Sequence, residues 1–323
     1  MMTYGENIDP TDEISLMLIG DDAIKALAAR TDEAEGSRSD YWEHQIGNFQ
    51  VAADGTMTGQ TALGNASKKV SLLRNFAHAA LQRPLHRLAA PFPDLADCVR
   101  LGRQIARRQN RQFTYDMLRQ SFTLALIRNY LDISSGEDCS LVIGDGYGVM
   151  TTLLLMHAPR RKVITVNLTK PLLLDLAYSR QAVPEARLAL VESAQEMRDA
   201  LADGGIRLIA VRADDADCIG DAAIGLAINI LSMQEMDSGV VKNYFRLLRG
   251  NRARQTAFYC SNKEIKVTNF DDYPWRPGDT ILHDSICEWS QWNYSARPPF
   301  WHRRPRSGKL IRHRLALLEM ENT

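Results

Sequence analysis

Between residues 136 and 262, short and almost wholly apolar runs alternate with longer segments whose apolar residues recur at helical spacing. Such runs are typical of strands in a parallel sheet that is covered on both faces, and the segments between them are typical of the covering helices. The pattern therefore predicts an α/β fold, a doubly wound, Rossmann-like and mostly parallel sheet. The predicted strands are CSLVIG, KVITVNL, ARLALVES, IRLIAVRA, IGLAINI and QTAFYCSN, with HRLALLEM as a last strand near the C-terminus.

Three other regions flank this predicted domain. Residues 1–69 combine a short amphipathic run with charged and Gly/Thr-rich stretches, and we expect a partly ordered N-terminal arm. Residues 70–135 carry apolar residues at three- and four-residue intervals, which predicts an N-terminal helical block. Residues 263–323 are rich in Pro, Trp and Arg ahead of the last strand, which predicts a structured C-terminal insertion followed by that strand.

Composition narrows the classes of partner. The chain has 323 residues, and Lys+Arg and Asp+Glu both number 39, so the formal net charge is zero. A neutral chain gives no reason to expect binding to nucleic acid or to a membrane. The five cysteines are widely spaced without a zinc-ligand pattern, and no apolar stretch approaches membrane-spanning length. We therefore expect a soluble cytoplasmic protein; the sequence leaves the oligomeric state open, with a homodimer as one option.

The segment LVIGDGYG joins the first predicted strand to a helix and carries Gly144, Gly146 and Gly148 at alternate positions. Glycines there let the backbone turn tightly and let a ligand lie against the main chain, next to the free N–H groups of the helix N-terminus. Dinucleotide-binding folds open similarly, but they place a third glycine where this chain has Val149. The loop is a candidate cofactor site, and the alternative is a tight turn that binds nothing.

The loop sequence GDGYG resembles the first motif of class I, Rossmann-fold methyltransferases that use S-adenosylmethionine (SAM). The similarity continues through PLLLDLAYSRQ and through NILSMQEMDSGVVKNYFRLL, which is similar to a segment of the sugar O-methyltransferases, and it covers about residues 116–274. The resemblance implies SAM as cofactor and methyl transfer to a hydroxyl of a sugar or glycan. It makes residues 70–135 a lid over the cofactor and residues 263–323 the acceptor side.

The resemblance also assigns residues to the cofactor. Asn167 would meet the ribose, Asn229 would lie near the reacting methyl, and the loop itself would hold the methionine part through Gly144, Asp145, Gly146 and Gly148. Two positions depart from the family pattern. Val142 stands where an acid usually precedes the loop, and Asn167 stands where Asp or Glu commonly accepts both ribose hydroxyls. An amide can accept one hydroxyl, but it lacks the stronger charge-assisted bonds.

Methyl transfer to a sugar hydroxyl requires in-line alignment and a base within hydrogen-bond reach. Ligands of open α/β sheets bind beyond the carboxyl ends of the strands, where Glu235 and Gln234 follow IGLAINI. Glu235 fits equally well as a first-turn acid in a capping box begun by Ser232. His283 and Asp284 in TILHDSICEW form a second candidate pair because histidine titrates near neutral pH, although a lone loop histidine is usually a packing residue.

Aromatic and acidic residues elsewhere have two interpretations each. Trp289, Trp292 and Trp301 either line an acceptor pocket together with neighbouring arginines or pack the insertion on the core. The acidic run in VRADDADC follows a strand and is more typical of a turn than of a cation site, so we predict no metal.

Three alternatives to a sugar methyltransferase stay open. A methyltransferase acting on a non-sugar small molecule would keep the same loop. A Rossmann-type oxidoreductase is disfavoured by the glycine spacing and by the lack of a suitable Tyr-x-x-x-Lys pair. A non-catalytic, methyltransferase-like binding protein is favoured by Val142 and Asn167. If the chain is an enzyme of this kind, we expect an open pocket against Gly144–Gly148 that is large enough for the adenosyl group of the cofactor.

Overall fold

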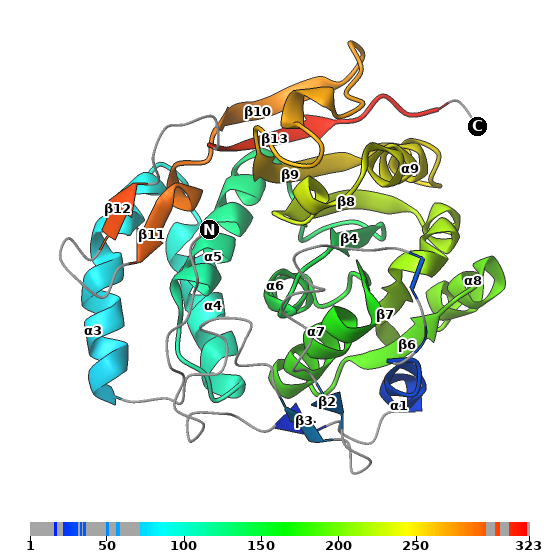
Figure 1. Cartoon of the computed structure of the whole chain (residues 1–323), viewed down its shortest axis with the longest axis horizontal. Helices are drawn as coiled ribbons and strands as arrows, with labels where there is room; N and C mark the ends of the chain where they lie inside the picture. Colours follow the sequence, from blue (N-terminus) through cyan, green and yellow to red (C-terminus); the bar gives the residue numbers. More distant parts are fainter. Residues whose placement is uncertain are drawn as a thin grey trace.

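The computed structural model describes residues 16–17, 22–31, 33, 35–36, 50–51, 56–58, 72–294, 301–303 and 310–321. At its centre is an eight-stranded sheet in the order β10-β13-β9-β8-β4-β5-β7-β6 (Figure 1). Every pairing in it is parallel except those of β13, which runs antiparallel to both of its neighbours. The strands are β4 (Cys139–Ile143), β5 (Val163–Asn167), β6 (Arg187–Val191), β7 (Ile206–Arg212), β8 (Ile224–Ile230), β9 (Ala257–Lys263), β10 (Thr280–Ile286) and β13 (Ile311–Leu317).

Helices cover both faces of this sheet, and each face has its own apolar core (Figure 1). The first face carries α1 (Asp22–Ala28), α4 (Leu95–Arg108), α5 (Tyr115–Tyr130), α6 (Val149–His157) and α7 (Thr169–Ala182). The second face carries α8 (Ala194–Ala202), α9 (Ser238–Arg249) and the 3₁₀ segment η6 (Ala213–Asp221). The fold is therefore the predicted doubly wound α/β architecture, because nearly continuous apolar strands can be buried only between two helical layers.

The remaining described elements are short and lie outside the large sheet. They are β1 (Leu16–Met17), β2 (Gln50–Val51), β3 (Thr56–Thr58), α3 (Leu72–Gln82), η5 (Arg83–Leu88), η7 (Met233–Glu235), η8 (Phe270–Asp272), η9 (Glu288–Ser290), β11 (Trp292–Tyr294) and β12 (Trp301–Arg303). Two of the helices expected to form a lid, α4 and α5, pack against α6 in the core of the first face. Within the described part of the chain, no helix combines the length and apolarity needed to span a bilayer.

The predicted insertion also supplies a strand to the central sheet, which the sequence pattern did not indicate. In β10, TILHDSI pairs with β13 and becomes the edge of the sheet. The strand is half-buried and carries polar side chains on both faces, so it lacks the apolar run that identified the central strands. A buried ion pair anchors the segment before it, because Arg249 of α9 holds Asp279 through two hydrogen bonds of 2.7 and 2.9 Å.

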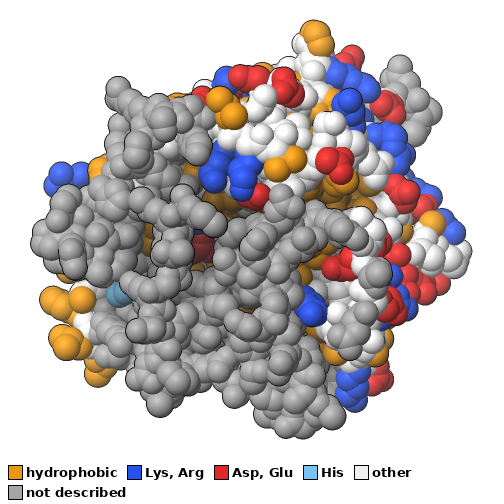
Figure 2. Space-filling model, viewed as in Figure 1, with side chains coloured by type: hydrophobic (Ala, Val, Ile, Leu, Met, Phe, Trp, Pro, Cys, Tyr) orange, Lys and Arg blue, Asp and Glu red, His pale blue; other side chains and the backbone are white. Residues whose placement is uncertain are grey.

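Exposed charges of both signs are mixed on the second face. Figure 2 shows Lys and Arg side chains interleaved with Asp and Glu on the side of the molecule formed by α8 and α9. Arg198 and Arg252 share Asp221 there, and Arg246 pairs with Asp217 at 2.9 Å. Because positive and negative side chains alternate, this side of the described structure has no extended surface of a single charge, in line with the zero formal net charge.

Candidate functional site

The glycine loop lies where the order of the strands reverses. The chain leaves β4 for β5 on one side and returns later to β8 on the other side, so the loop after β4 stands between the carboxyl ends of these two neighbours. This topological switch point is where open α/β sheets bind ligands. The sequence placed the loop after the first strand, and the sheet order makes that strand central.

Several residues with positive φ angles lie close together at this point. Gly144, Gly146 and Gly148 have φ angles of 70°, 85° and 61°, and Leu231, just after β8, has a φ of 62°. A bulky non-glycine residue at positive φ costs energy, and such residues persist mainly where the surrounding structure and a function hold them. A Cβ at Gly148 would stand 2.4 Å from the backbone oxygen of Asp175, so a side chain there would displace α7. The loop therefore requires glycine for both torsion and close packing.

Asp145, the acid inside the loop, caps the helix that follows it. Its two carboxylate oxygens accept hydrogen bonds from the backbone N–H groups of Met150 and Thr151, at 3.1 and 2.7 Å. These are the first-turn N–H groups that usually make a helix N-terminus a binding site for a phosphate. In this chain a side-chain carboxylate already occupies them.

A second carboxylate, Asp175 of α7, is fully buried on the other side of the loop. It accepts hydrogen bonds from the backbone N–H of Gly148 and from the side-chain amide of Asn167, both at 2.9 Å. Among the described residues neither Asp175 nor Asp145 forms an ion pair. Burial raises the pKa of Asp175 well above its ordinary value, and the nearby Asp145 carboxylate raises it further. Burial is also the main cause of the raised pKa of Asp145.

The raised pKa of Asp175 predicts how stability varies with pH. A carboxyl whose pKa is higher in the folded state binds its proton more tightly there, so its contribution to stability falls as pH rises above the ordinary carboxyl pKa toward the folded value. We expect Asp175→Asn to remove this loss. The melting temperature of the variant relative to wild type should therefore increase steadily as the pH rises from the ordinary carboxyl pKa of 3.8 toward neutral pH.

The control for this experiment is Asp199→Asn, which changes an exposed carboxylate on α8. Its melting temperature should follow that of wild type at every pH. A difference between Asp175→Asn and wild type that stays constant with pH would show that Asp175 does not titrate in this range, and the assignment of a raised pKa would be wrong.

Asn167 and Asn229 both lie at the carboxyl ends of strands beside the loop, and both are buried. The Asn167 amide donates to Asp175, and its oxygen accepts from the backbone N–H of Leu168 at 3.0 Å. Asn229 donates to the Ile143 backbone oxygen at 2.9 Å, and its oxygen accepts from the backbone N–H of Met233 and from a neighbouring amide. The two predicted cofactor contacts therefore use their side chains to fix the loop.

Asn229 belongs to a network that ties β8 to β4 and β9. It donates to the Ser232 hydroxyl, which in turn donates to the Ile143 backbone oxygen, and it accepts from the amide of Asn262 on β9 at 2.8 Å. Ser232 precedes the 3₁₀ segment η7 and Glu235 lies in its first turn, but the Ser232 side chain makes no capping hydrogen bond, so the predicted capping box does not form. Helix α9 instead begins after Asp237, whose carboxylate accepts from the backbone N–H groups of residues 239 and 240.

Glu235, the first candidate base, lies at the carboxyl end of β8, next to the strand that carries the glycine loop. Its carboxylate contacts Lys266 at 2.5 Å and accepts from the Gln234 side chain at 3.1 Å. Gln234 is buried, and its oxygen accepts from the backbone N–H of Lys263. The structure thus places Glu235 on the correct edge of the sheet, held in an ion pair.

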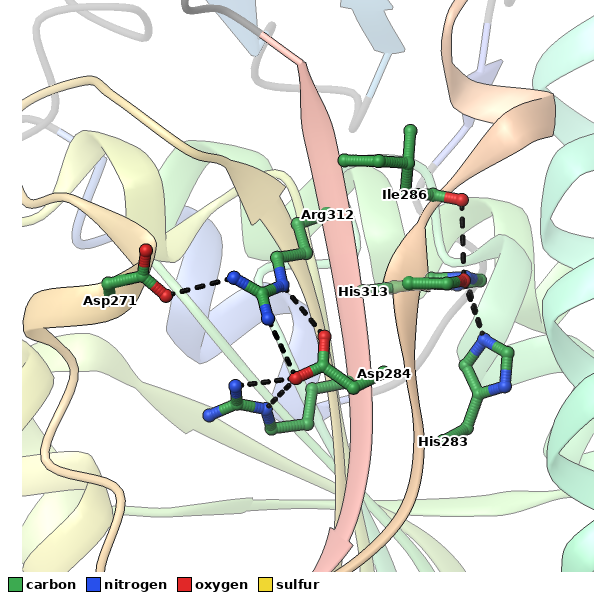
Figure 3. A network of polar contacts seen from close by, with 8 residues as sticks. Asp271, His283, Asp284, Ile286, Arg312 and His313 are labelled. Atoms are coloured by element: carbon green, nitrogen blue, oxygen red, sulfur yellow. Dashed lines mark hydrogen bonds and ion pairs between the residues drawn. The ribbon is translucent and has the colours of Figure 1, made fainter.

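His283 and Asp284, the second candidates, lie on β10, four strands away from the glycine loop. Four spacings between neighbouring strands amount to about 19 Å, so the structure does not bring this pair to the loop. Asp284 is held instead by Arg312 and Arg314 at 2.6 to 2.9 Å (Figure 3). Burial opposes ionisation of Asp284, but hydrogen bonds from the two arginines outweigh it and lower its pKa.

The side chain of His283 points along the sheet toward His313 of β13 (Figure 3), and their Nε2 atoms are 3.0 Å apart. His313 also contacts the Tyr259 hydroxyl through Nδ1 at 3.0 Å. Burial lowers the pKa of His313 to about 3, and burial also lowers the pKa of His283. Both rings are therefore neutral near pH 7 and form a packed polar chain between strands.

The tryptophans and the acidic run have structural roles where the structure describes them. Trp289 is 4% exposed and packs edge-to-face on Phe92 and Phe122, so it belongs to the core and not to an acceptor pocket. The Trp301 side chain lies outside the described residues. The run ADDAD forms the start of η6, and the described residues contain no cluster of side chains suited to a metal ion.

Two cavities of the described structure lie away from the loop. One has a volume of about 340 Å³ and is lined by the end of α5 and the loop that follows it; the other, of about 180 Å³, lies at the amino ends of β4 and β8. Neither is lined by a residue of Gly144–Gly148. Gly144–Tyr147 are half-buried and Gly148 is buried, and these two cavities do not supply the open pocket that an enzyme requires against the loop.

No protein-family model matches this sequence, and no curated protein is recognisably related to it. Among solved structures, the chain is similar to an S-adenosylmethionine-dependent methyltransferase from Mesorhizobium loti, with a TM-score of 0.37, 14% identity and coverage of 59% of this chain and 95% of that one. It is also similar to magnesium protoporphyrin IX methyltransferase from Synechocystis PCC 6803 with bound SAM, with a TM-score of 0.34, 13% identity and coverage of 70% and 84%. Similarity at this level leaves the function to be argued from the residues of the chain.

Asp175 is the site residue that the sequence analysis missed. It is the one acid in the apolar helical run PLLLDLAYS, and an isolated acid on the buried face of a helix usually has a specific partner. That signal was available in the sequence. Which partner it meets depends on how α7 packs against the loop, which the sequence does not state.

Proposed function

We propose that this protein is a SAM-dependent methyltransferase whose cofactor binds at the glycine loop after β4. The observation that carries the proposal is a pair of carboxylates, Asp145 within that loop and Asp175 packed against it. No described basic side chain forms an ion pair with either of them. A buried carboxylate is stabilised by a cation and destabilised by a further anion. The loop therefore suits a cationic ligand.

This charge pattern separates the two cofactors that a glycine loop could hold. A dinucleotide places its pyrophosphate on the N–H groups of the helix N-terminus, but Asp145 already accepts from those of Met150 and Thr151. Its carboxylate would also repel the pyrophosphate. SAM carries a positive sulfonium and an ammonium group, and both are attracted to carboxylates. The residues present fit SAM and do not fit a dinucleotide.

The residues around the loop would act mainly by positioning. When bound, SAM supplies a methyl group on an electrophilic sulfur. Gly144, Gly146 and Gly148 keep the main chain free of side chains where the ligand approaches, and Asn229 holds the ends of β4 and β8 at a fixed separation. Alignment of this kind contributes a large part of the rate in displacement reactions. The chain need supply only a rigid cradle and an acceptor aligned with it.

For the acceptor, we propose a hydroxyl of a sugar or glycan. The support is the resemblance of NILSMQEM to sugar O-methyltransferases, together with the place of Glu235 at the carboxyl end of β8, one strand from the loop. Glu235 would accept the hydroxyl proton after its ion pair with Lys266 opens. We prefer Glu235 to His283, which lies on β10 at the far edge of the sheet. Transfer of labelled methyl groups to a panel of sugars tests the acceptor.

Calorimetric titration with SAM, its demethylated product S-adenosylhomocysteine (SAH) and NAD⁺ tests the cofactor. We expect micromolar binding of SAM and no binding of NAD⁺. SAM affinity should fall as the pH is lowered, because burial raises the pKa values of Asp145 and Asp175 and their protonation removes the attraction for the sulfonium. SAH, which lacks that charge, should show the smaller change. Absence of SAM binding at millimolar concentration, or preferential binding of NAD⁺, would refute the proposal.

A non-catalytic binding protein is the second candidate function. The observation in its favour is that Asn229 and Gln234 are buried and engaged within the protein, while Glu235 is held by Lys266. Such a protein would bind SAM or SAH with the same pH dependence but would transfer no methyl group to any member of the panel.

A further inference from the structure

One described segment of the N-terminal arm lies along the carboxyl edge of the sheet on the side of the proposed adenosyl group. We call its described residues, 22–31, 33 and 35–36, the strap. Its helix α1 lies beside β6 and α7 (Figure 1), and it buries Ile24 and Leu27 at 1% and 0% exposure. Burial of these two large apolar side chains stabilises the docked position of α1. The strap is thus a docked part of the fold.

Beyond α1, successive polar residues of the strap meet successive strands. Arg30 donates to Glu192, just after β6, at 2.7 Å. Glu33 accepts from Arg212 at the end of β7, the next strand in the sheet, at 3.0 Å. The strap therefore runs along the carboxyl edge from the outermost strand toward the centre, in the direction of the glycine loop.

The next contact reaches the first residue of α7, just after β5, the strand beside the glycine loop. Glu35 accepts from both the backbone N–H and the hydroxyl of Thr169, each at 2.6 Å, through its Oε1 atom. The adjacent Gly36 donates its N–H to Asp214, after β7, at 2.9 Å. Glu35 is half-buried, and among the described residues its Oε2 atom has no hydrogen-bond partner. A carboxylate oxygen is thus presented at the end of the second strand.

This is the place where doubly wound folds hold a ribose. A carboxylate after the second strand usually accepts the ribose hydroxyls, but this chain has Asn167 there, and the Asn167 amide is engaged by Asp175 and Leu168. We propose that Glu35 of the strap supplies the missing carboxylate and accepts a ribose hydroxyl of the cofactor through Oε2. The inference rests on the proposed function. It makes the strap one wall of the adenosyl site.

The test is a binding measurement that needs no turnover. The full chain and its Glu35→Gln variant are titrated calorimetrically with SAH and with 2′-deoxy and 3′-deoxy SAH. A hydrogen bond to a charged group contributes enough that Glu35→Gln should weaken SAH binding about 10- to 100-fold. The deoxy analogue that lacks the hydroxyl from which Glu35 accepts a hydrogen bond should bind to wild type more weakly than SAH by a similar factor. Loss of the same hydroxyl should change binding to the variant much less.

Glu33→Gln is the matched control, because it changes an exposed carboxylate on the same strap, and among the described residues that carboxylate pairs with Arg212 at the end of β7. It should leave SAH affinity within about twofold of wild type, since an exposed ion pair contributes little. If Glu33→Gln weakened SAH binding as much as Glu35→Gln does, the strap would affect binding through its docking alone. That result would overturn the proposed role of Glu35.

The remaining outcomes also decide between explanations. If wild type binds SAH and Glu35→Gln binds it equally well, this inference is wrong and the proposed function stands. If Glu35→Gln binds SAH more tightly, the carboxylate competes with the cofactor, and the proposed contact is again wrong. If wild type binds neither SAM nor SAH, the proposed function fails and this inference fails with it.

Discussion

Replacement of Arg249 by Met is expected to lower the free energy of unfolding by about 3 to 5 kcal/mol, the largest effect of any single substitution considered for this protein. The Arg249 and Asp279 side chains are 1% and 0% exposed, and they form a bidentate ion pair. Arg249 also donates to the backbone oxygens of Pro274 and Glu319. Removal of the guanidinium leaves a buried carboxylate and two carbonyl groups without their donor.

The Asp279 carboxyl explains why the loss should be large. Its burial opposes ionisation, but hydrogen bonds from Arg249 and from backbone N–H groups outweigh burial and lower its pKa. Without Arg249 that compensation is mostly lost, whereas the burial remains. The pair also joins α9 to the segment before β10 and to the C-terminal strand, so its loss should loosen the edge of the sheet.

Equilibrium unfolding in urea measures this effect. Arg246→Met is the control, because Arg246 lies on the same helix, is 58% exposed and pairs with the exposed Asp217. That variant should stay within about 0.5 kcal/mol of wild type. The double variant Arg249→Met with Asp279→Leu should recover much of the loss, because apolar groups can replace a buried ion pair. A loss below about 1 kcal/mol for Arg249→Met would contradict the importance of the pair.

The second large effect is on ligand binding. Gly146→Val should weaken SAM binding by about 100-fold or more, because Gly146 has a φ of 85°, which a β-branched residue adopts only at a high energetic cost. The loop would have to change its path to relieve that strain. Its N–H groups and the Asp145 carboxylate would then move relative to the ligand.

The matched control is Gly204→Val, because Gly204 lies in an exposed turn and a Cβ there would meet no atom within 4 Å. It should bind SAM as wild type does. Thermal unfolding of both variants shows whether they remain folded, since a change confined to the loop should leave most of the core intact. If the Gly146→Val variant stays folded and binds SAM with unchanged affinity, SAM binds at a site other than the glycine loop.

The central fold could be predicted from sequence because its strands have a strong signal. All seven predicted strands appear in the sheet with boundaries shifted by at most three residues, since most of them are apolar on both faces. The edge strand β10 could not be found in this way. Its pairing with β13 depends on backbone hydrogen bonds and on contacts such as Asp284 with Arg312, which leave no apolar run in the sequence.

The candidate site was predictable in part. The alternating glycines identified the loop, because positive φ angles restrict the residue type and so leave a trace in the sequence. The role of Asp145 as a helix cap was not evident, because the same residue fits a ligand contact and a capping contact. The predicted base at His283 was placed by chemistry alone, and only the order of the strands shows how far it lies from the loop.

The sequence by itself determined the doubly wound sheet and the position of its glycine loop, because local apolar patterns and glycine torsions are properties of short segments. The tertiary structure alone decided which charges gather there. Asp175 and Glu35 reach the loop and the neighbouring strand end from α7 and from the strap, and the distances along the sequence leave their partners undetermined. The ligand class inferred for this protein depends on those charges, because buried carboxylates select a cation only once the fold has brought them together.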